Sequence, residues 1–182
     1  MKLIRSLVAK MEKKCSKYPL LFKIYSWPYK EILKNEISLA GVGPEDKVLN
    51  IGCGAMPFSA IYMARLTGAK VVAVDKDPEV IAKARRAVKD LKLENQIKVV
   101  RGDGSELEEI DFTVALVALQ TEPKNGVLKN LLENSAKGSR LVFRSPRPFF
   151  NSQYDLLSDK FKEDGAVKQK MITFDRSLLF IS

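Results

Sequence analysis

The stretch that most constrains the fold of this chain covers residues 48–75 and holds two glycines close together. Residues 48–51 form a short, mostly apolar run, as in a strand that is buried on both faces of a sheet. Gly52 and Gly54 carry no Cβ, so the backbone can turn sharply there and come close to a ligand. Pro57 suits the first position of a following helix, where a missing N–H costs nothing. The order of strand, glycine turn and helix predicts a parallel α/β unit that binds its ligand at the carboxyl ends of the strands.

A second apolar run, residues 71–74, ends at Asp75. Asp75 follows Gly52 at about the spacing at which an acidic side chain meets the hydroxyl pair of a ribose. A dinucleotide fingerprint needs a third glycine where this chain has Pro57, which disfavours a nicotinamide cofactor. The turn at residues 52–54, followed by Asp75, resembles the first two motifs of the class I S-adenosylmethionine-dependent methyltransferase superfamily. This resemblance implies S-adenosylmethionine as the ligand, and a scaffold that has lost its ligand is the alternative.

Composition excludes several classes of protein. The chain has 182 residues, of which 46% are hydrophobic and 29% charged, as in one soluble globular domain. No apolar run is long enough for a transmembrane segment, and two cysteines form no disulfide framework, so a cytoplasmic location is expected. The chain has no histidine, which excludes a histidine base and histidine-ligated metal. Carboxylates, tyrosines and lysines are left for proton transfer, and no metal site is predicted.

The net charge of +9 is concentrated near the N-terminus, where residues 1–34 hold nine Lys and Arg side chains against Glu12 and Glu31. A solvated helix face explains such a distribution. A surface for RNA, for an anionic membrane or for an acidic partner is the alternative.

Residues 1–45 are expected to form an N-terminal helical extension, and residues 46–182 a single Rossmann-like domain that binds S-adenosylmethionine. Pro19 and Pro28 are expected to separate the helices that apolar periodicity predicts over residues 2–14, 20–25 and 29–40. We expect this extension to pack as a lid over the ligand end of the sheet.

After Asp75, strand and helix signals alternate. Asp77 and Pro78 are typical of a helix start, with Asp77 as the N-cap. Further helices are predicted from Thr121 onward and over residues 149–162, the second with Phe150, Tyr154, Leu157 and Phe161 on its inner face. Further strands are predicted over residues 97–100, 113–119, 141–143, 167–172 and 178–181, the last two joined by a turn at residues 175–176. The alternation predicts an α/β fold with a doubly wound, mostly parallel, seven-stranded Rossmann-like sheet. The superfamily resemblance implies that the last strand is antiparallel.

The cofactor site is expected at the ends of the first four strands. Asp75 would bind the ribose hydroxyls, and a simple charge near the following helix is its alternative role. The resemblance implies that Asp103 meets the adenine amino group, with an ordinary turn aspartate as the alternative. Asn50 stands where most methyltransferases carry Asp or Glu. The expected cofactor-binding residues are Asn50, Gly52, Cys53, Gly54, Asp75, Lys76, Asp103, Gly104, Leu119 and Gln120.

Four blocks, taken in order, resemble nicotianamine synthase and its archaeal and bacterial relatives. They are residues 29–39, 52–64, 117–119 and 144–150. The resemblance implies transfer of the 3-amino-3-carboxypropyl group of S-adenosylmethionine to an amine, with release of methylthioadenosine. The loop after residue 119 lacks the Asn/Asp-Pro-Pro-aromatic motif of enzymes that methylate exocyclic base nitrogens, and it lacks a cysteine nucleophile.

Within this resemblance, Glu36 matches the glutamate that lies near the attacking amine. A carboxylate there could accept a proton from the amine and stabilise the developing cation. Tyr29 would help to shape the same pocket. Arg144 would bind a carboxylate of a substrate, or it pairs with a neighbouring acid. The alternative for Glu36 is an exposed helix charge.

The resemblance leaves the reaction open in two respects. The helical extension is shorter than in the relatives, which predicts a more open site, a different acceptor or closure by a second subunit in a homodimer. The preferred acceptor is a small amine or amino acid. Methyl transfer to a small molecule or RNA is one alternative, and a non-catalytic S-adenosylmethionine-binding or partner subunit is the other.

Overall fold

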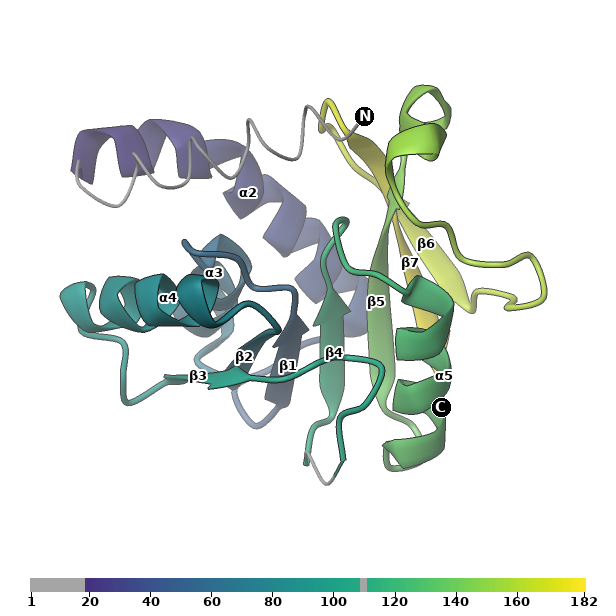
Figure 1. The fold of residues 1–182 in the computed structure, drawn as a ribbon, viewed down its shortest axis with the longest axis horizontal. Helices are drawn as coiled ribbons and strands as arrows, with labels where there is room; N and C mark the ends of the chain where they lie inside the picture. Colours follow the sequence, from purple (N-terminus) through teal and green to yellow (C-terminus); the bar gives the residue numbers. More distant parts are fainter. Residues whose placement is uncertain (1–18, 109–110) are drawn as a thin grey trace.

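The structure is a computed structural model that describes residues 19–108 and 111–182, with side chains from residue 29 onward. Figure 1 shows a central sheet with helices on both faces. The elements are α2 (Pro19–Ala40), β1 (Lys47–Ile51), α3 (Phe58–Thr67), β2 (Lys70–Asp75), α4 (Pro78–Asp90), β3 (Ile97–Arg101), β4 (Val114–Val117), α5 (Lys124–Asn134), β5 (Arg140–Pro146), the 3-10 helix η1 (Pro148–Gln153), β6 (Gly165–Lys168) and β7 (Phe174–Ile181).

The described part of the chain forms one seven-stranded sheet in the order β3-β2-β1-β4-β5-β7-β6. The first five strands run parallel to one another. β7 lies antiparallel to β5, and β6 lies antiparallel to β7. The doubly wound, mostly parallel sheet with an antiparallel last strand is therefore confirmed.

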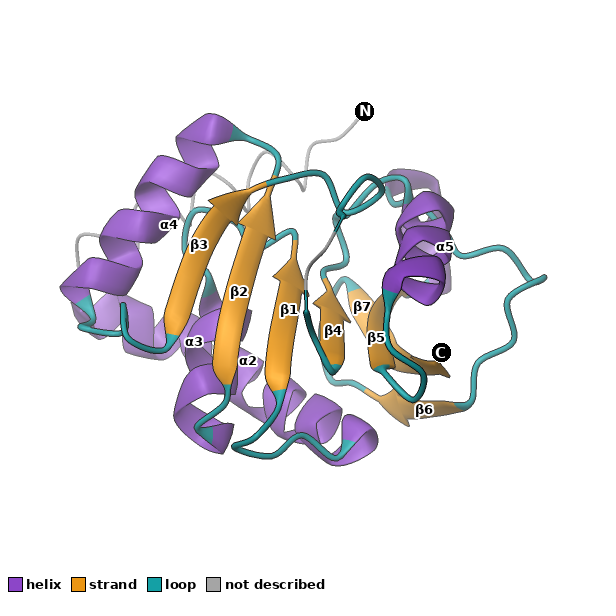
Figure 2. Cartoon of the chain, turned by 90° about the horizontal axis from the view of Figure 1, so that it is seen from below, coloured by secondary structure: helices purple, strands orange, loops and turns teal. Residues whose placement is uncertain are grey.

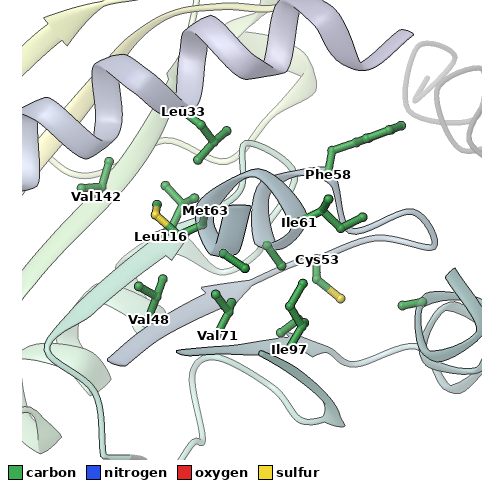
Figure 3. Packing of buried hydrophobic residues seen from close by; sticks show 14 of the residues in the cluster. Leu33, Val48, Cys53, Phe58, Ile61, Met63, Val71, Ile97, Leu116 and Val142 are labelled. Atoms are coloured by element: carbon green, nitrogen blue, oxygen red, sulfur yellow. The ribbon is translucent and has the colours of Figure 1, made fainter. Parts of the chain in front are cut away.

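Two apolar clusters cover the two faces of the sheet, because neighbouring strand residues point to opposite sides. Val48 belongs to the cluster beneath α2, α3 and α4, whereas Leu49 belongs to the cluster beneath α5. Figure 2 shows α5 set apart from the other helices. Figure 3 shows Leu33 of α2 pointing toward Met63 of α3 and Leu116 of β4, so α2 is packed into the first cluster.

α2 corrects one prediction about the N-terminal extension. The helix continues through Pro28, where a break was predicted. A proline inside a helix removes one backbone hydrogen bond, and it can kink the helix without ending it. Figure 1 shows α2 changing direction along its length. The predicted helix over residues 2–14 and the basic residues up to Lys17 lie outside the described residues.

The region after β5 corrects a second prediction. The helix predicted over residues 149–162 is wrong, since η1 ends at Gln153 and no regular structure follows before β6. The apolar residues that suggested one helical face pack on opposite faces of the sheet. Phe150 and Tyr154 join the α2 cluster, whereas Leu157 and Phe161 join the α5 cluster.

The final hairpin is shifted relative to the prediction. The turn predicted at residues 175–176 lies within β7, and the connection between β6 and β7 spans residues 169–173. Arg176 is paired with Ser145 of β5 and with Lys168 of β6. Pairing on both sides extends β7 beyond its most apolar residues.

Two local predictions about helices have clear outcomes. Asp77 caps α4 as predicted, because its carboxylate accepts a hydrogen bond from the Glu79 amide at 2.8 Å. Pro57 occupies the position just before α3, which begins at Phe58. Within residues 19–108 and 111–182, no helix has the length and hydropathy that a bilayer span needs.

Candidate functional site

The glycine turn after β1 adopts a conformation that favours glycine. Gly52 has a φ of 74° and Gly54 a φ of 72°. The Gly52 amide donates to the carbonyl of Val74 at 2.9 Å, which joins the turn to the end of β2. A Cβ on Gly52 would lie 2.6 Å from the Thr121 Oγ1 atom, too close for any side chain. The turn therefore depends on glycine for both its backbone angle and its space.

Asp75 lies at the carboxyl end of β2 and faces this turn. Its Oδ2 atom accepts a hydrogen bond from the Gly54 amide at 3.0 Å, and its Oδ1 atom accepts one from the Asp77 amide at 3.2 Å. Each carboxylate oxygen has a second lone pair. The half-buried Asp75 carboxylate thus combines a structural role with capacity for further donors, such as a pair of hydroxyls.

Asp103 follows β3 at the same edge of the sheet. Its Oδ1 atom accepts hydrogen bonds from the amide and the hydroxyl of Ser105, at 3.0 and 2.7 Å. These two bonds are the main reason why the pKa of Asp103 lies below its ordinary value, and the charge of Lys76, 3.8 Å away, lowers the pKa further. Asp103 thus makes the contacts of an ordinary turn aspartate. Because its pKa is lowered, its carboxylate is ionised at neutral pH.

Asn50 is buried in β1, with 1% of its surface exposed. Its Nδ2 atom donates to the Leu116 carbonyl at 3.2 Å. Its Oδ1 atom has no hydrogen-bond partner among the described residues. A buried acceptor without a donor costs free energy, so this oxygen suits a ligand that brings an N–H group.

The other expected cofactor-binding residues differ in their surroundings. Cys53 and Leu119 are buried, and Figure 3 shows Cys53 among apolar side chains. Gln120 is exposed, and Lys76 donates to the Glu122 carbonyl at 3.3 Å. A Cβ on Gly104 would lie 2.7 Å from Ile51, so packing against β1 requires glycine there.

Glu36 and Arg144 form the most buried charged pair of the described residues. The Arg144 Nε atom donates to Glu36 Oε1 and its Nη2 atom donates to Oε2, both at 2.8 Å. Glu36 is 1% exposed, so its alternative as an exposed helix charge is wrong. Burial alone would lower the pKa of Arg144, but the Glu36 carboxylate more than offsets this and raises the pKa above its ordinary value.

The strand register places this pair at the edge of the sheet that holds the glycine turn. Ile51, Val117 and Phe143 are aligned across β1, β4 and β5. Gly52 and Arg144 each follow one residue later in the same direction. The ring of Tyr29, two turns before Glu36 on α2, stacks on Phe58 at 5.3 Å. The structure therefore gathers the expected cofactor and acceptor residues at one edge.

Sequence reasoning missed two kinds of residue at this edge. Ser177 and Gln169, from the final hairpin, are both buried: Ser177 donates to Glu36, and Gln169 donates to Ser177. Residues 174–181 do not alternate between apolar and polar, so the sequence gives no signal for either residue. Lys124 is 1% exposed and donates to the carbonyls of Leu119 and Asp155 at 2.7 and 2.8 Å. Nothing in the sequence separates Lys124 from an exposed lysine in the first turn of a helix.

A metal centre finds no support in the described ranges. Among residues 19–108 and 111–182, no group of three or more cysteine, aspartate or glutamate side chains could hold a metal ion.

Comparisons with known proteins agree with this geometry. Residues 48–137 match the family model described as "Methyltransferase domain". An L-histidine 2-aminobutanoyltransferase of Yersinia pestis is 32% identical over 133 residues, which cover 71% of this chain and 50% of the relative. A carboxy-S-adenosyl-L-methionine synthase of Yersinia enterocolitica is 27% identical over 167 residues, covering 80% of this chain and 61% of the relative. The chain thus spans about half the length of the first of these relatives.

One solved structure covers nearly the whole chain. A glutamate-to-glutamine variant of the nicotianamine synthase MtNAS, in complex with S-adenosylmethionine, matches with a TM-score of 0.86 and 24% identity. The match covers 98% of this chain and 74% of MtNAS. Residues 48–137 are thus similar to a methyltransferase domain, and the chain has the fold of the class I S-adenosylmethionine-dependent methyltransferases.

Proposed function

We propose that the chain binds S-adenosylmethionine and transfers its 3-amino-3-carboxypropyl group to the nitrogen of a small amine or amino acid. The name of the Yersinia pestis relative describes the transfer of a related four-carbon group to histidine. MtNAS, with the same fold, holds S-adenosylmethionine. In this proposal residues 46–182 form the cofactor-binding domain, and the preceding residues cover the acceptor.

The residues at the carboxyl edge of the sheet fit the proposed cofactor. The carboxylate of Asp75 has the free acceptor capacity that two ribose hydroxyls need, and the ionised Asp103 can accept from an adenine amino group. The turn at Gly52 and Gly54 allows close approach of the amino acid part. The unpaired Oδ1 atom of Asn50 can accept from the ammonium group of that part.

The pair of Glu36 with Arg144 is the observation that favours transfer to an amine. An amine must be neutral to attack carbon, and it becomes positively charged as the new bond forms. A carboxylate held by Arg144 can attract that amine, stabilise the developing charge and receive its proton. S-adenosylmethionine supplies the activated carbon and a neutral thioether leaving group, methylthioadenosine.

The burial of Glu36 sets a condition on this role. With 1% of Glu36 exposed, an acceptor reaches the carboxylate only when part of its cover moves. Tyr29 lies two turns earlier on the same helix and stacks on Phe58, next to the glycine turn. This position supports the proposal that Tyr29 lines the space between cofactor and acceptor.

The test is the identity of the nucleoside product. The purified protein is incubated with S-adenosylmethionine and a pool of amines and amino acids, and the nucleosides are identified by mass spectrometry. We expect methylthioadenosine whose formation depends on both protein and acceptor, since S-adenosylmethionine also releases some on its own. The Glu36→Gln variant should lose this activity while it still binds S-adenosylmethionine.

Other products would identify the alternatives. S-adenosylhomocysteine would show methyl transfer and would overturn the proposed reaction despite the shared fold. Binding of S-adenosylmethionine without any product, over a broad acceptor pool, would favour a non-catalytic subunit.

A further inference from the structure

A buried chain of hydrogen bonds leads from the final hairpin to Glu36. Ser177 of β7 is fully buried, and its hydroxyl donates to Glu36 Oε1 at 2.7 Å. Gln169 is 4% exposed, and its Nε2 atom donates to the Ser177 hydroxyl at 3.1 Å. The chain of contacts thus runs from the loop after β6, through β7, to the proposed catalytic carboxylate.

The orientation of Gln169 is fixed by its other contacts. Its Oε1 atom accepts from the Nδ2 atom of Asn35 at 3.0 Å, so the amide nitrogen must face Ser177. The same nitrogen lies 3.4 Å from the carbonyl of Ile32, which it also donates to. Because Gln169 donates to the Ser177 oxygen, the hydroxyl proton of Ser177 is left to point at Glu36.

These contacts give the two carboxylate oxygens of Glu36 different numbers of hydrogen-bond donors. A carboxylate has about four lone-pair sites, two on each oxygen. Oε1 accepts from Arg144 and from Ser177, so both of its sites are used. Oε2 accepts from Arg144, and neither Ser177 nor Gln169 donates to it.

We propose that Ser177 and Gln169 are positioning residues that occupy Glu36 Oε1 and leave Oε2 as the oxygen that meets the acceptor amine. This inference rests on the proposed function, because it assigns a role to the same carboxylate. Neither residue touches the acceptor. Each acts through Glu36, by fixing the rotamer of its side chain.

The test compares Ser177→Ala with Ser139→Ala. Ser139 is 3% exposed, and its hydroxyl donates to the Phe112 carbonyl at the opposite end of the sheet, so both changes remove one buried hydroxyl. We expect Ser177→Ala to lower kcat about tenfold, since a hydrogen bond to a charged group is lost. The KM for S-adenosylmethionine should stay unchanged, and Ser139→Ala should leave kcat unchanged.

The pH dependence provides a readout that loss of packing would not move. Removing the Ser177 hydroxyl takes away a direct hydrogen bond to the Glu36 carboxylate, which loss of packing elsewhere would not do. The acidic limb of the rate profile should then shift to higher pH. Gln169→Met removes the donor to Ser177 and should shift the acidic limb in the same direction, but by less. This variant replaces Ser177→Ala in the test if Ser177→Ala does not fold.

The outcomes separate this inference from the proposed function. A wild-type protein that forms no methylthioadenosine overturns the proposed function and this inference with it. An active wild-type protein whose Ser177→Ala and Gln169→Met variants keep both kcat and the acidic limb overturns this inference alone.

Discussion

The guanidinium of Arg144 and the carboxylate of Glu36 meet in a bidentate pair with both contacts at 2.8 Å, across 108 residues of sequence. Arg144 lies in β5, and Glu36 lies on α2, which crosses the same face of the sheet. The Cζ atom of Arg144 also lies 5.5 Å from the centroid of the Phe174 ring in β7. The pair therefore fastens the helical extension to the sheet at the edge where the proposed reaction takes place.

Removing one member of this pair should destabilise the fold. Arg144→Met leaves a buried carboxylate without its counter-charge and should lower the free energy of unfolding by about 3–5 kcal/mol. The double variant Glu36→Met with Arg144→Met removes both charges and should recover most of that loss. Urea unfolding of the three proteins measures both effects. Equal stability of wild type and Arg144→Met would show that the pair does not fasten α2.

An exposed pair on the same helix serves as control for this prediction. Lys34 and Glu31 form an ion pair in which both side chains are at least half exposed, at 50% and 61%. Lys34→Met should change the free energy of unfolding by less than about 0.5 kcal/mol.

The glycine turn should not tolerate a side chain. Gly52→Ala forces a residue with a Cβ into a φ of 74° and against Thr121, and should cost about 2–4 kcal/mol of stability. Gly43→Ala is the matched control, because a Cβ on Gly43 meets nothing within 4 Å. Thermal unfolding compares the two variants. A Gly52→Ala protein as stable as Gly43→Ala would contradict the described turn.

The Asp75 carboxylate should contribute to cofactor affinity. Asp75→Asn keeps the shape but weakens the acceptor for two hydroxyls, and should raise the Kd for S-adenosylmethionine about tenfold or more. Asp77→Asn is the control, since asparagine caps a helix about as well as aspartate. Isothermal titration measures both affinities. Equal Kd values would argue against a ribose contact at Asp75.

Asp46 should make stability depend on pH at the opposite end of the sheet. Burial by itself raises the pKa of its carboxyl, but bonds from the Gly43 amide and the Thr113 hydroxyl, with the charge of Arg140, hold the pKa below its ordinary value of 3.8. The folded state therefore favours the ionised form. This contribution is fully present above pH 3.8 and is lost as the pH falls through the lower folded pKa.

The measurement for Asp46 is a comparison of urea midpoints. Wild type should be more stable than Asp46→Asn at about pH 6, and the difference should shrink as the pH falls below 3.8 toward the lower folded pKa. The comparison with the variant isolates Asp46 from other carboxylates that titrate in the same range. A difference that grows toward low pH would contradict the lowered pKa.

The sequence was sufficient for the parallel part of the sheet. Buried strands such as β1 and β2 are short apolar runs next to glycine and acid signals, and their order follows from alternation with helices. The helix cap at Asp77 could also be predicted, because a cap depends only on residues next to it in the sequence. These features are determined by neighbours in the sequence.

The residues that sequence reasoning placed wrongly depend on distant packing. Pro28 was expected to end a helix, although the fold accommodates it within α2. Phe150 and Phe161 fitted one helical face, yet they pack on opposite faces of the sheet. The sequence also could not identify Arg144 as the partner of Glu36, since this pairing depends on how α2 crosses β5.

The central claim is tested most directly by the fate of labels on S-adenosylmethionine. One sample carries the label in the methyl group and another carries it in the aminocarboxypropyl group, and each is incubated with the protein and an acceptor amine. The account predicts that the aminocarboxypropyl label appears in the acceptor while the methyl label stays in methylthioadenosine. A methyl label in the acceptor, with the other label in S-adenosylhomocysteine, would contradict it.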